Sequence, residues 1–357
     1  MRYVSTKHLK PGDKLSNDLS VSQNRVLLRR GRELSHSIIN KLEVLGFQGI
    51  YVDDKLSEGI VVSDVISPDL KNAAKAELQA LFHNGENNRH SKAKKQMPTI
   101  KSIVHNIVDE VVRNREIMIN IIDIRAYDDY TYSHSLNVAV LSVVMGTVLG
   151  LGKKQLHDLA MGSLLHDTGK MFVKKEILNK PARLTPEEFL EIKTHSERGY
   201  QYLCEQLEIP ENARIVALQH HEQFCGNGYP GGLSKDGIHL YGRICCVADV
   251  YDALTSDRPY RKSMLPSDAI EYIMSGYGTL FDPKIVEALT KKIAPYPVGT
   301  CVRLSTGQTA IVVKNYQETS LRPMVKLIVN GEAVEDYIDL THDMAALSIT
   351  INEIVNA

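Results

Sequence analysis

Hydrophobic residues recur with helical spacing through most of the middle of the chain, from residue 99 to residue 294. The first helix of this region has its hydrophobic face at Ile100, Ile103, Val104, Ile107, Val108 and Val111. The same spacing predicts helices over residues 136–149 and 155–165, and Thr185 can cap a further helix. A strand is expected only near residues 237–241. The pattern therefore predicts an all-helical domain over residues 99–294.

Residues 1–65 mix short apolar runs with turn signals, which is typical of a small α+β module. Pro11-Gly12-Asp13 predicts a turn, and residues 25–28 and 49–52 read as short strands. Ser35 can cap a helix that continues to Leu45.

A connecting segment of residues 66–98 is expected between this module and the helical domain. Residues 69–82 have helical periodicity, whereas residues 83–98 are polar and show none. We therefore interpret residues 83–98 as a linker.

Residues 295–357 change to short β-type runs separated by glycine or polar turns. The predicted strands cover residues 300–304, 309–314, 324–329 and 346–351. Asn330-Gly331 favours a tight hairpin turn. A small β-rich module is the result.

Chain length, net charge and cysteine spacing exclude several classes of protein. The 357 residues suffice for two or three domains, and a formal net charge of −1 argues against a binder of duplex nucleic acid. No stretch approaches the ~18 apolar residues of a membrane span, and the N-terminal residues lack a signal-peptide core. The five cysteines show no disulfide or zinc spacing. We expect a cytoplasmic protein with no membrane partner.

The helical domain also carries an ordered set of histidines and aspartates. Its members are His134, His166, Asp167, His195, His220, His221 and Asp249. Imidazole and carboxylate ligands together suit Fe, Mn or Zn, and side chains from several helices can converge in a bundle core. Asp167, directly after a histidine, can bridge two ions about 4 Å apart that polarise a phosphoryl group for attack.

Each of these residues has a simpler explanation when taken alone. His134 reads as a hydrogen-bonded core histidine, and His195 reads equally well as a surface residue. Asp249 fits less easily, because an unpaired carboxylate in an apolar run is costly. The joint occurrence of the residues favours a metal site.

Four segments resemble the HD-GYP subgroup of the HD-domain metal-dependent phosphohydrolases. They are Leu165–Lys170, His220–Glu222 with the following Gly226–Pro230, Asp249–Arg261, and Asp129–Ser135. The resemblance covers roughly residues 100–293, and residues 1–65 resemble a short module often found before this domain. It implies a mainly α fold, in which an all-helical HD-type bundle is flanked by a small N-terminal α+β module and a small C-terminal β-rich module.

Members of this subgroup hydrolyse cyclic di-GMP to pGpG, in some cases on to GMP, in bacterial second-messenger signalling. The resemblance implies the same activity here, with two divalent ions, iron first and manganese as the alternative. The implied metal ligands are His134, His166, Asp167, His195, His220, His221 and Asp249. Asp167 would bridge the ions and Lys170 would contact the scissile phosphate. Arg258 and Arg261 would hold substrate phosphate or guanine.

The Gly-Tyr-Pro loop and two acidic residues are implied to support the site. Gly228, Tyr229 and Pro230 would shape the site and contact partner proteins. Glu222 and Asp252 would orient histidines by hydrogen bonds.

One position departs from part of the subgroup. Some members recruit a third metal with a glutamate where this chain has Tyr130, so two ions are expected here.

Several alternatives stay open. The substrate can be cyclic GMP-AMP instead, or the chain can be a cyclic-dinucleotide-responsive binding module with little turnover. A phosphatase of monomeric nucleotides is disfavoured because it gives no reason for the Gly-Tyr-Pro loop, Arg258 and Arg261. The sequence leaves the metal and the oligomeric state open, a homo-oligomer included.

Overall fold

The computed structural model describes residues 1–21, 25–45, 47, 49–87, 89–119, 130–180, 182–256 and 263–356. By its internal contacts the chain divides into two units. The first combines residues 1–64, 116–129 and 291–357, and the second combines residues 65–115 and 130–290. Both ends of the chain therefore belong to one unit, and the predicted helical domain makes up most of the other.

The N-terminal part of the first unit is a small α+β fold, as the sequence predicts. Its elements are β1 (Arg2–Ser5), β2 (Lys14–Leu15), β3 (Leu19–Val21), β4 (Arg25–Leu28), α1 (His36–Val44) and β5 (Gly49–Asp53). The strands pair antiparallel in the order β1-β5-β2, with β3-β4 as a separate pair. The Ser35 hydroxyl accepts a hydrogen bond from the Ile38 N–H at 3.3 Å and caps α1 at the predicted residue.

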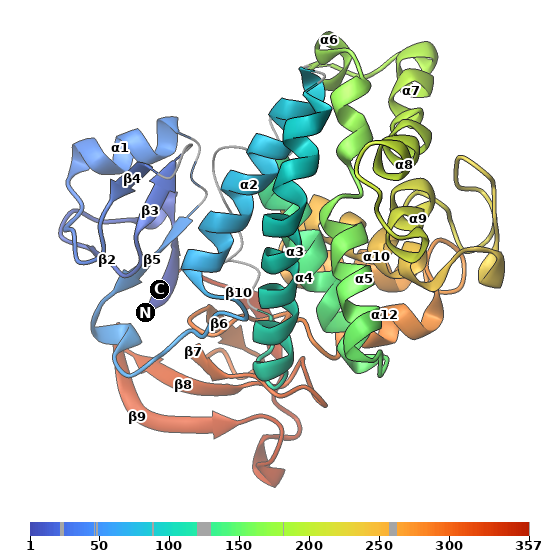
Figure 1. Ribbon diagram of the computed structural model, residues 1–357. Coiled ribbons are helices and arrows are strands. Elements are labelled where there is room, and N and C mark those ends of the chain that lie inside the picture. The colour runs from blue at the N-terminus through green and yellow to red at the C-terminus, as the bar shows by residue number, and fades with distance from the viewer. Residues whose placement is uncertain are drawn as a thin grey trace. The chain divides into compact units, whose positions relative to one another are not determined.

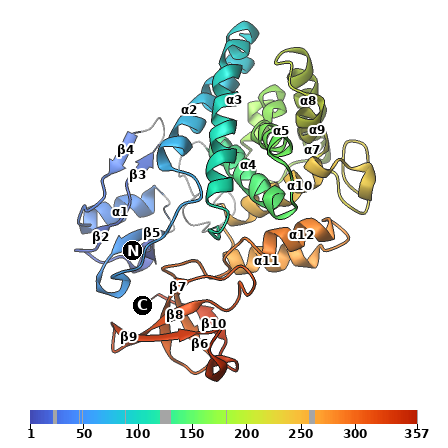
Figure 2. The same cartoon turned by 60° about the horizontal axis from the view of Figure 1, so that its bottom comes forward.

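The C-terminal part of the first unit is one antiparallel sheet with the strand order β10-β6-β7-β8-β9 (Figure 2). The strands are β6 (Cys301–Leu304), β7 (Thr309–Lys314), β8 (Met324–Val329), β9 (Glu332–Asp339) and β10 (Ile351–Ile354). β7 and β8 coincide with the predicted ranges. Asn330 and Gly331 join β8 to β9 with positive φ angles of 52° and 80°, as a tight hairpin turn requires.

Two strands of this sheet differ from the prediction. The sequence of β9, EAVEDYID, is largely polar and only partly buried, so it carries no hydrophobic strand signal. The strand expected at residues 346–351 instead begins at Ile351, because Met344–Ala346 form the short helix η6.

The N- and C-terminal parts touch directly within the first unit. The Tyr3 N–H donates to the Gly299 carbonyl at 3.2 Å. Gly299 has φ +86°, and a Cβ there would lie 2.9 Å from the Met1 carbonyl oxygen, so the close approach needs glycine. Ile60 packs with Cys301 and Ile311 in a shared apolar cluster.

The second unit is helical (Figure 1). Its α-helices are α2 (Pro68–Glu86), α3 (His90–Arg113), α4 (Tyr130–Val148), α5 (Lys153–Leu164), α6 (Lys175–Leu178), α7 (Pro186–Lys193), α8 (His195–Glu205), α9 (Glu211–Gln219), α10 (Leu240–Thr255), α11 (Pro266–Ser275) and α12 (Pro283–Thr290). Two 3-10 helices are η4 (Thr168–Phe172) and η5 (Lys235–Gly237). The predicted fold class, mainly α with a small α+β module and a β-rich module at the ends, is confirmed.

The expected linker at residues 83–98 is instead helical over most of its length. α2 continues to Glu86 and α3 begins at His90, and the two long helices run side by side (Figure 1). Ala93 and Met97 are buried, in phase with the apolar face of α3 further on. Two apolar residues among many polar ones are too few to produce a recognisable helical periodicity. The sequence therefore predicts a linker where the structure has helix.

The helices that carry the candidate site pack in one group. α10 contacts α4 and α9, α5 contacts α4 and α9, and α8 contacts α9 and η4. The strand expected near residues 237–241 is not formed, because η5 ends at Gly237 and α10 begins at Leu240. The carboxyl ends of α5 and α9 therefore meet the amino end of α8 and the sides of α4 and α10.

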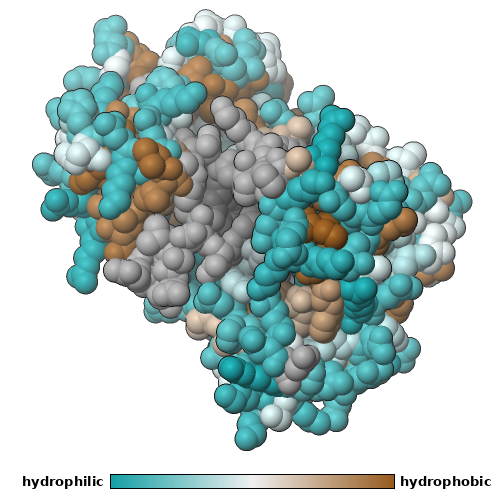
Figure 3. Space-filling view, turned by 90° about the horizontal axis from the view of Figure 1, so that it is seen from above, coloured by the Kyte–Doolittle hydropathy of each residue, from teal (hydrophilic) through white to brown (hydrophobic). Residues whose placement is uncertain are grey.

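Among the residues coloured by hydropathy in Figure 3, hydrophilic ones predominate and hydrophobic ones form several separate groups. Among the described residues, no helix has the length and apolar character needed to cross a membrane. The five cysteines all lie in the described part of the chain, and no disulfide joins them there.

Candidate metal centre

The structure brings the seven predicted metal ligands together in the second unit. They are His134 on α4, His166 and Asp167 between α5 and η4, His195 at the start of α8, His220 and His221 directly after α9, and Asp249 on α10. Most of these side chains are buried, and His221 is half-buried. His134 and Asp249, which are 115 positions apart in sequence, thus lie in the same site, because the helices that carry them pack around one core.

Backbone carbonyls fix the orientation of three histidines. His166, His195 and His220 each donate Nδ1–H to a carbonyl three residues earlier, at 2.8, 2.6 and 3.0 Å. A carbonyl oxygen only accepts, so Nδ1 carries a proton, and in the neutral ring Nε2 then keeps its lone pair. Each Nε2 faces the cluster, which is the arrangement that metal-binding histidines use.

Asp167 lies between two groups of histidines. Its Oδ2 is 3.3 Å from His166 Nε2 and 3.8 Å from His134 Nε2. Its Oδ1 is 3.6 Å from His195 Nε2 and 3.9 Å from His220 Nε2. The two oxygens of one carboxylate therefore serve two different sets of imidazoles.

The cluster fits divalent metal ions on its own geometry. The Nε2 of His166 and the Oδ1 of Asp167 are buried and have no hydrogen-bond partner among the described residues, which is costly unless something else binds them. The Nε2 atoms of His195 and His220 approach to 3.2 Å. Three groups of three cluster residues have ligand atoms within 4.8 Å of one another. They are His134, His166 and Asp167; His195, His220 and His221; and His166, His220 and Asp249. A mixed set of imidazole and carboxylate suits divalent transition metals.

The protonation states follow from burial and neighbouring charge. Burial would raise the pKa of Asp167, but His166 and Lys170 hold it well below its usual value. Burial lowers the pKa of His220 well below its usual value and that of His221 to about 3. His134 is the exception: burial opposes its charge, yet contacts with Asp249 and Asp252 raise its pKa to about 9. In the ion-free cluster Asp167 is therefore anionic, His220 and His221 are neutral, and His134 is an imidazolium.

Asp252 makes the histidine contact that the sequence suggests. Its Oδ2 lies 2.7 Å from His134 Nδ1, and its Oδ1 accepts from Asn137 Nδ2 at 2.8 Å. Asn137 is absent from the sequence-based list of site residues. Its position three residues after His134 on a helix places both on one face, which is the signal that would have identified it.

We expect Asp252→Asn to weaken Mn²⁺ binding by roughly 10- to 100-fold, because His134 loses the anionic partner that fixes its ring. Calorimetric Mn²⁺ titration measures the change. Asp236→Asn is the matched control, since Asp236 is an exposed partner of Arg243 away from the cluster. Equal Mn²⁺ affinity of Asp252→Asn and the wild type would contradict the orienting role.

The Gly-Tyr-Pro loop closes over one histidine. The Tyr229 ring stacks on His221, with centroids 4.7 Å apart and planes at 26°, and its N–H donates to the His221 carbonyl at 3.2 Å. A Cβ on Gly228 would lie 2.3 Å from the Gln223 nitrogen, so only glycine allows this approach. Pro230 follows Tyr229 through a cis peptide bond.

Among the described residues the hydrogen bonds of the Glu222 carboxylate go to the loop and not to the histidine that the sequence suggests. Its two carboxylate oxygens accept from the backbone N–H groups of Gly231 and Leu233, at 2.7 and 2.9 Å. Backbone donors in a glycine-rich loop leave no sequence signal, whereas a glutamate next to two histidines suggests a histidine partner. Glu222 therefore fixes the loop after Pro230.

The accessible side of the cluster is lined by three side chains. Lys170, His221 and Asp249 are 29%, 26% and 13% exposed, whereas Asp167 is only 2% exposed. Lys170 Nζ donates to Asp167 Oδ2 at 2.5 Å. Lys193, which the sequence analysis did not single out, holds its Nζ 5.0 Å from the Tyr229 ring centroid. Lys170 thus places one cation at the cluster, and Lys193 places a second beside the Gly-Tyr-Pro loop.

Arg258 and Arg261 lie outside the described residues, and so does the side chain of Tyr130. Their expected roles stay predictions.

Comparison with known protein families identifies two domains. A family model described as an HD domain matches residues 116–285. A second model, described as a KOW domain associated with HD domains, matches residues 301–357.

Several curated proteins are similar in sequence to this chain. A cyclic di-GMP phosphodiesterase of Pseudomonas aeruginosa, PA4108, is 36% identical over 231 residues, which is 65% of this chain and 56% of that protein. The cyclic di-GMP phosphodiesterase response regulator RpfG of Xanthomonas campestris is 39% identical over 42% of this chain and 41% of its own length. The 3′3′-cGAMP-specific phosphodiesterase 3 of Vibrio cholerae is 30% identical over 74% of this chain and 55% of that protein. The chain spans about half the length of these relatives.

Among solved structures, Bd1817, an HDG"Y"P protein from Bdellovibrio bacteriovorus, matches with a TM-score of 0.52 and 17% identity. The match covers 80% of this chain and 97% of that one, and it shows a shared fold. The two family models assign the domains of this chain: it carries an HD domain, followed by a KOW domain of the kind associated with HD domains.

Proposed function

We propose that this chain is a metal-dependent phosphodiesterase that hydrolyses cyclic di-GMP to pGpG. The observation that carries the proposal is the position of Asp167, whose two oxygens face two separate histidine groups. A carboxylate placed in this way is suited to bridge two ions. The names of the relatives PA4108 and RpfG supply the substrate class.

Two divalent ions would be held by the seven residues of the cluster, with Asp167 shared between them. One would have His134, His166 and Asp249, and the other would have His195, His220 and His221. Bound ions would supply a hydroxide nucleophile at neutral pH and polarise the phosphoryl oxygens. Iron is the first choice and manganese the alternative, because nitrogen and oxygen ligands without thiolate serve both.

The chain's own residues would bind and orient the phosphodiester. Lys170 Nζ lies against Asp167 Oδ2 and is partly exposed, so it can reach a phosphate oxygen and offset the charge that develops there. Arg258 and Arg261 would hold a second phosphate or a guanine base. Tyr229 would shape the entrance through its stacking on His221, and its loop would also contact partner proteins. The free cysteines are consistent with a cytoplasmic location.

We expect metal binding to release at least one proton per chain at about pH 7.5. The pKa of His134 is raised to about 9, so its ring is protonated in the ion-free protein and must lose a proton from Nε2 to bind metal. His220 and His221 have lowered pKa values and are already neutral. Apparent affinity should therefore fall about tenfold for each pH unit below 8. Calorimetry in two buffers of different ionisation enthalpy counts the protons, and a count of zero would contradict this protonation state.

The proposal is tested by chromatography of the products from cyclic di-GMP. The protein is purified without oxygen, loaded with Fe²⁺ or Mn²⁺, and compared with a His166→Ala, Asp167→Ala double variant. We expect pGpG from the wild type alone. No product from a protein that holds two ions would overturn the assignment.

Cyclic GMP-AMP is the second candidate substrate and is tested in the same assay. Three relatives in Vibrio cholerae are 3′3′-cGAMP-specific phosphodiesterases, 30–38% identical to this chain. Cleavage of cyclic GMP-AMP, with cyclic di-GMP left intact, would transfer the proposal to that substrate.

A further inference from the structure

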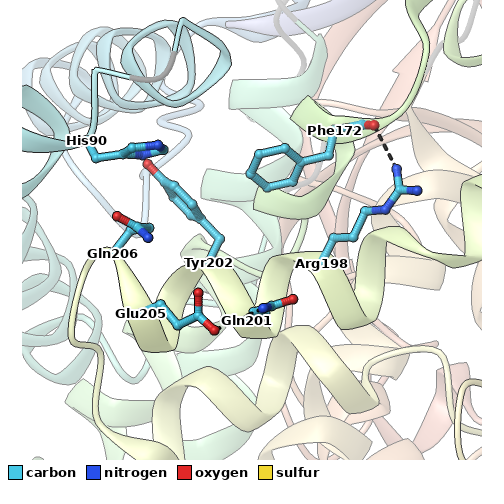
Figure 4. Close-up of a pocket in the computed structure, with 7 residues that line it drawn as sticks. All are labelled: His90, Phe172, Arg198, Gln201, Tyr202, Glu205 and Gln206. Atoms are coloured by element: carbon cyan, nitrogen blue, oxygen red, sulfur yellow. Dashed lines mark hydrogen bonds between the residues drawn. The ribbon is translucent and has the colours of Figure 1, made fainter.

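A surface cavity of about 430 Å³ lies in the second unit, apart from the metal cluster. It is lined by His90, Phe172, Arg198, Gln201, Tyr202, Glu205 and Gln206 (Figure 4). None of these residues belongs to the candidate metal ligands. The volume falls in the lower part of the range of roughly 300–1,000 Å³ that small-molecule sites occupy, so a base or nucleoside fits better than a dinucleotide.

Regular structure builds this cavity. Arg198, Gln201, Tyr202 and Glu205 follow the i, i+3, i+4, i+7 spacing of one face of α8. Phe172, the last residue of η4, forms the facing wall, and His90, the first residue of α3, closes one end (Figure 4). The site is therefore formed by regular elements and does not depend on a long loop.

Two polar atoms in the cavity wall lack partners. Tyr202 Oη and His90 Nδ1 are both buried without a hydrogen bond in the described part of the chain, and Tyr202 as a whole is 4% exposed. Figure 4 shows the Tyr202 hydroxyl directed toward the His90 ring. Burial also raises the pKa of Tyr202, so its hydroxyl keeps its proton. A ligand edge that presents both a donor and an acceptor would satisfy both atoms.

Aromatic rings supply the apolar surface. The rings of Phe172 and Tyr202 lie 5.5 Å apart at 63°, and those of His90 and Tyr202 lie 5.8 Å apart at 54°. Edge-on rings of this kind present faces and edges against which a flat ring packs well.

Charge on the rim is balanced. Arg198 donates Nη1–H to the Phe172 carbonyl at 2.8 Å and to Glu191 at 3.1 Å, so its cation already has an anionic partner. Glu205 accepts from Gln201 Nε2 at 2.9 Å. One cation and its carboxylate neighbours favour an uncharged ligand over a phosphate.

We propose that this cavity is a second ligand site, which binds the uncharged base of a purine nucleoside. A purine has the flat ring for the aromatic walls, and its edge carries neighbouring donors and acceptors for Tyr202 and His90. The ribose hydroxyls would meet the amides of Gln201 and Gln206. The site does not depend on the phosphodiesterase proposal, because none of its residues takes part in that chemistry.

Calorimetric titration of the metal-loaded full chain with guanosine and with adenosine tests the proposal. We expect saturable 1:1 binding of at least one of the two with a Kd below about 1 mM. Tyr202→Phe should weaken it roughly three- to tenfold, because the base loses one hydrogen bond. The same variant should unfold at an equal or higher temperature without nucleoside, since the lost hydroxyl had no protein partner.

Matched variants locate the binding. Tyr200→Phe makes the same chemical change on α8, but Tyr200 does not line the cavity and contacts Arg214 instead, so affinity should not change. Phe172→Leu should weaken binding by removing an aromatic wall, and Asp167→Asn should leave it intact. The proposal is overturned if neither nucleoside binds, if Tyr202→Phe and Phe172→Leu both bind as the wild type does, or if Asp167→Asn abolishes binding, which would place the nucleoside at the metal cluster.

Discussion

Asp167→Asn is expected to lower kcat for cyclic di-GMP by at least about a thousandfold, and to reduce bound metal from two ions per chain to one or none. The two oxygens of Asp167 face the two histidine groups, at 3.3–3.8 Å on one side and 3.6–3.9 Å on the other. An amide keeps the size of the side chain but removes its negative charge and one of its two acceptor oxygens. Both ions would then lose their common ligand.

Elemental analysis and product chromatography on the same samples measure the two effects. Asp158→Asn is the control, because Asp158 lies on α5, eight residues before His166, and is not among the ligands of the cluster. Its metal content and kcat should equal those of the wild type. If Asp167→Asn retained two ions and wild-type turnover, the bridging role would be excluded.

Lys170→Met should give the second-largest effect, a fall in kcat of roughly 10²–10³-fold with metal content unchanged. The Lys170 ammonium is 29% exposed and stands 2.5 Å from Asp167 Oδ2, at the accessible side of the cluster. In that position it can interact with charge that builds on the phosphate during attack. Methionine keeps most of the side-chain volume without the cation, and bound ions would still neutralise Asp167.

Steady-state kinetics with parallel metal analysis separate this role from a structural one. A loss confined mainly to kcat, with KM changed little, indicates an interaction made in the transition state. Lys175→Met serves as the control, since Lys175 pairs with Glu86 at the surface. If the Lys170→Met variant lost metal as well as activity, Lys170 would instead have a structural role in holding the metal-binding residues in place.

Much of the fold could be predicted because its helices and inner strands are amphipathic or buried. β7 and β8 have apolar centres and match their predicted ranges, and Ser35 caps α1 as expected. β9 could not be predicted, because its side chains are mostly exposed and its strand identity comes from pairing with β8. The start of α3 could not be predicted for a similar reason, since only Ala93 and Met97 of its first turns are buried.

The residues of the candidate site could be predicted from the sequence, but some of their hydrogen-bond partners could not. The order of histidines and aspartates identifies residues that the structure places together, although they come from five segments of the chain. The partner of Glu222 could not be inferred, because it consists of backbone N–H groups. Lys193 was missed because a single lysine away from the motif carries no distinctive spacing, whereas the position of Asn137 three residues after His134 could have identified it.

The most direct test of the two-ion phosphodiesterase is to titrate the ion-free protein with Mn²⁺ and record bound ions and pGpG formation in the same samples. We predict that turnover of cyclic di-GMP stays low up to one ion per chain and rises to its maximum as the second ion binds. Full turnover with a single ion per chain, or no pGpG with two ions bound, would contradict the account.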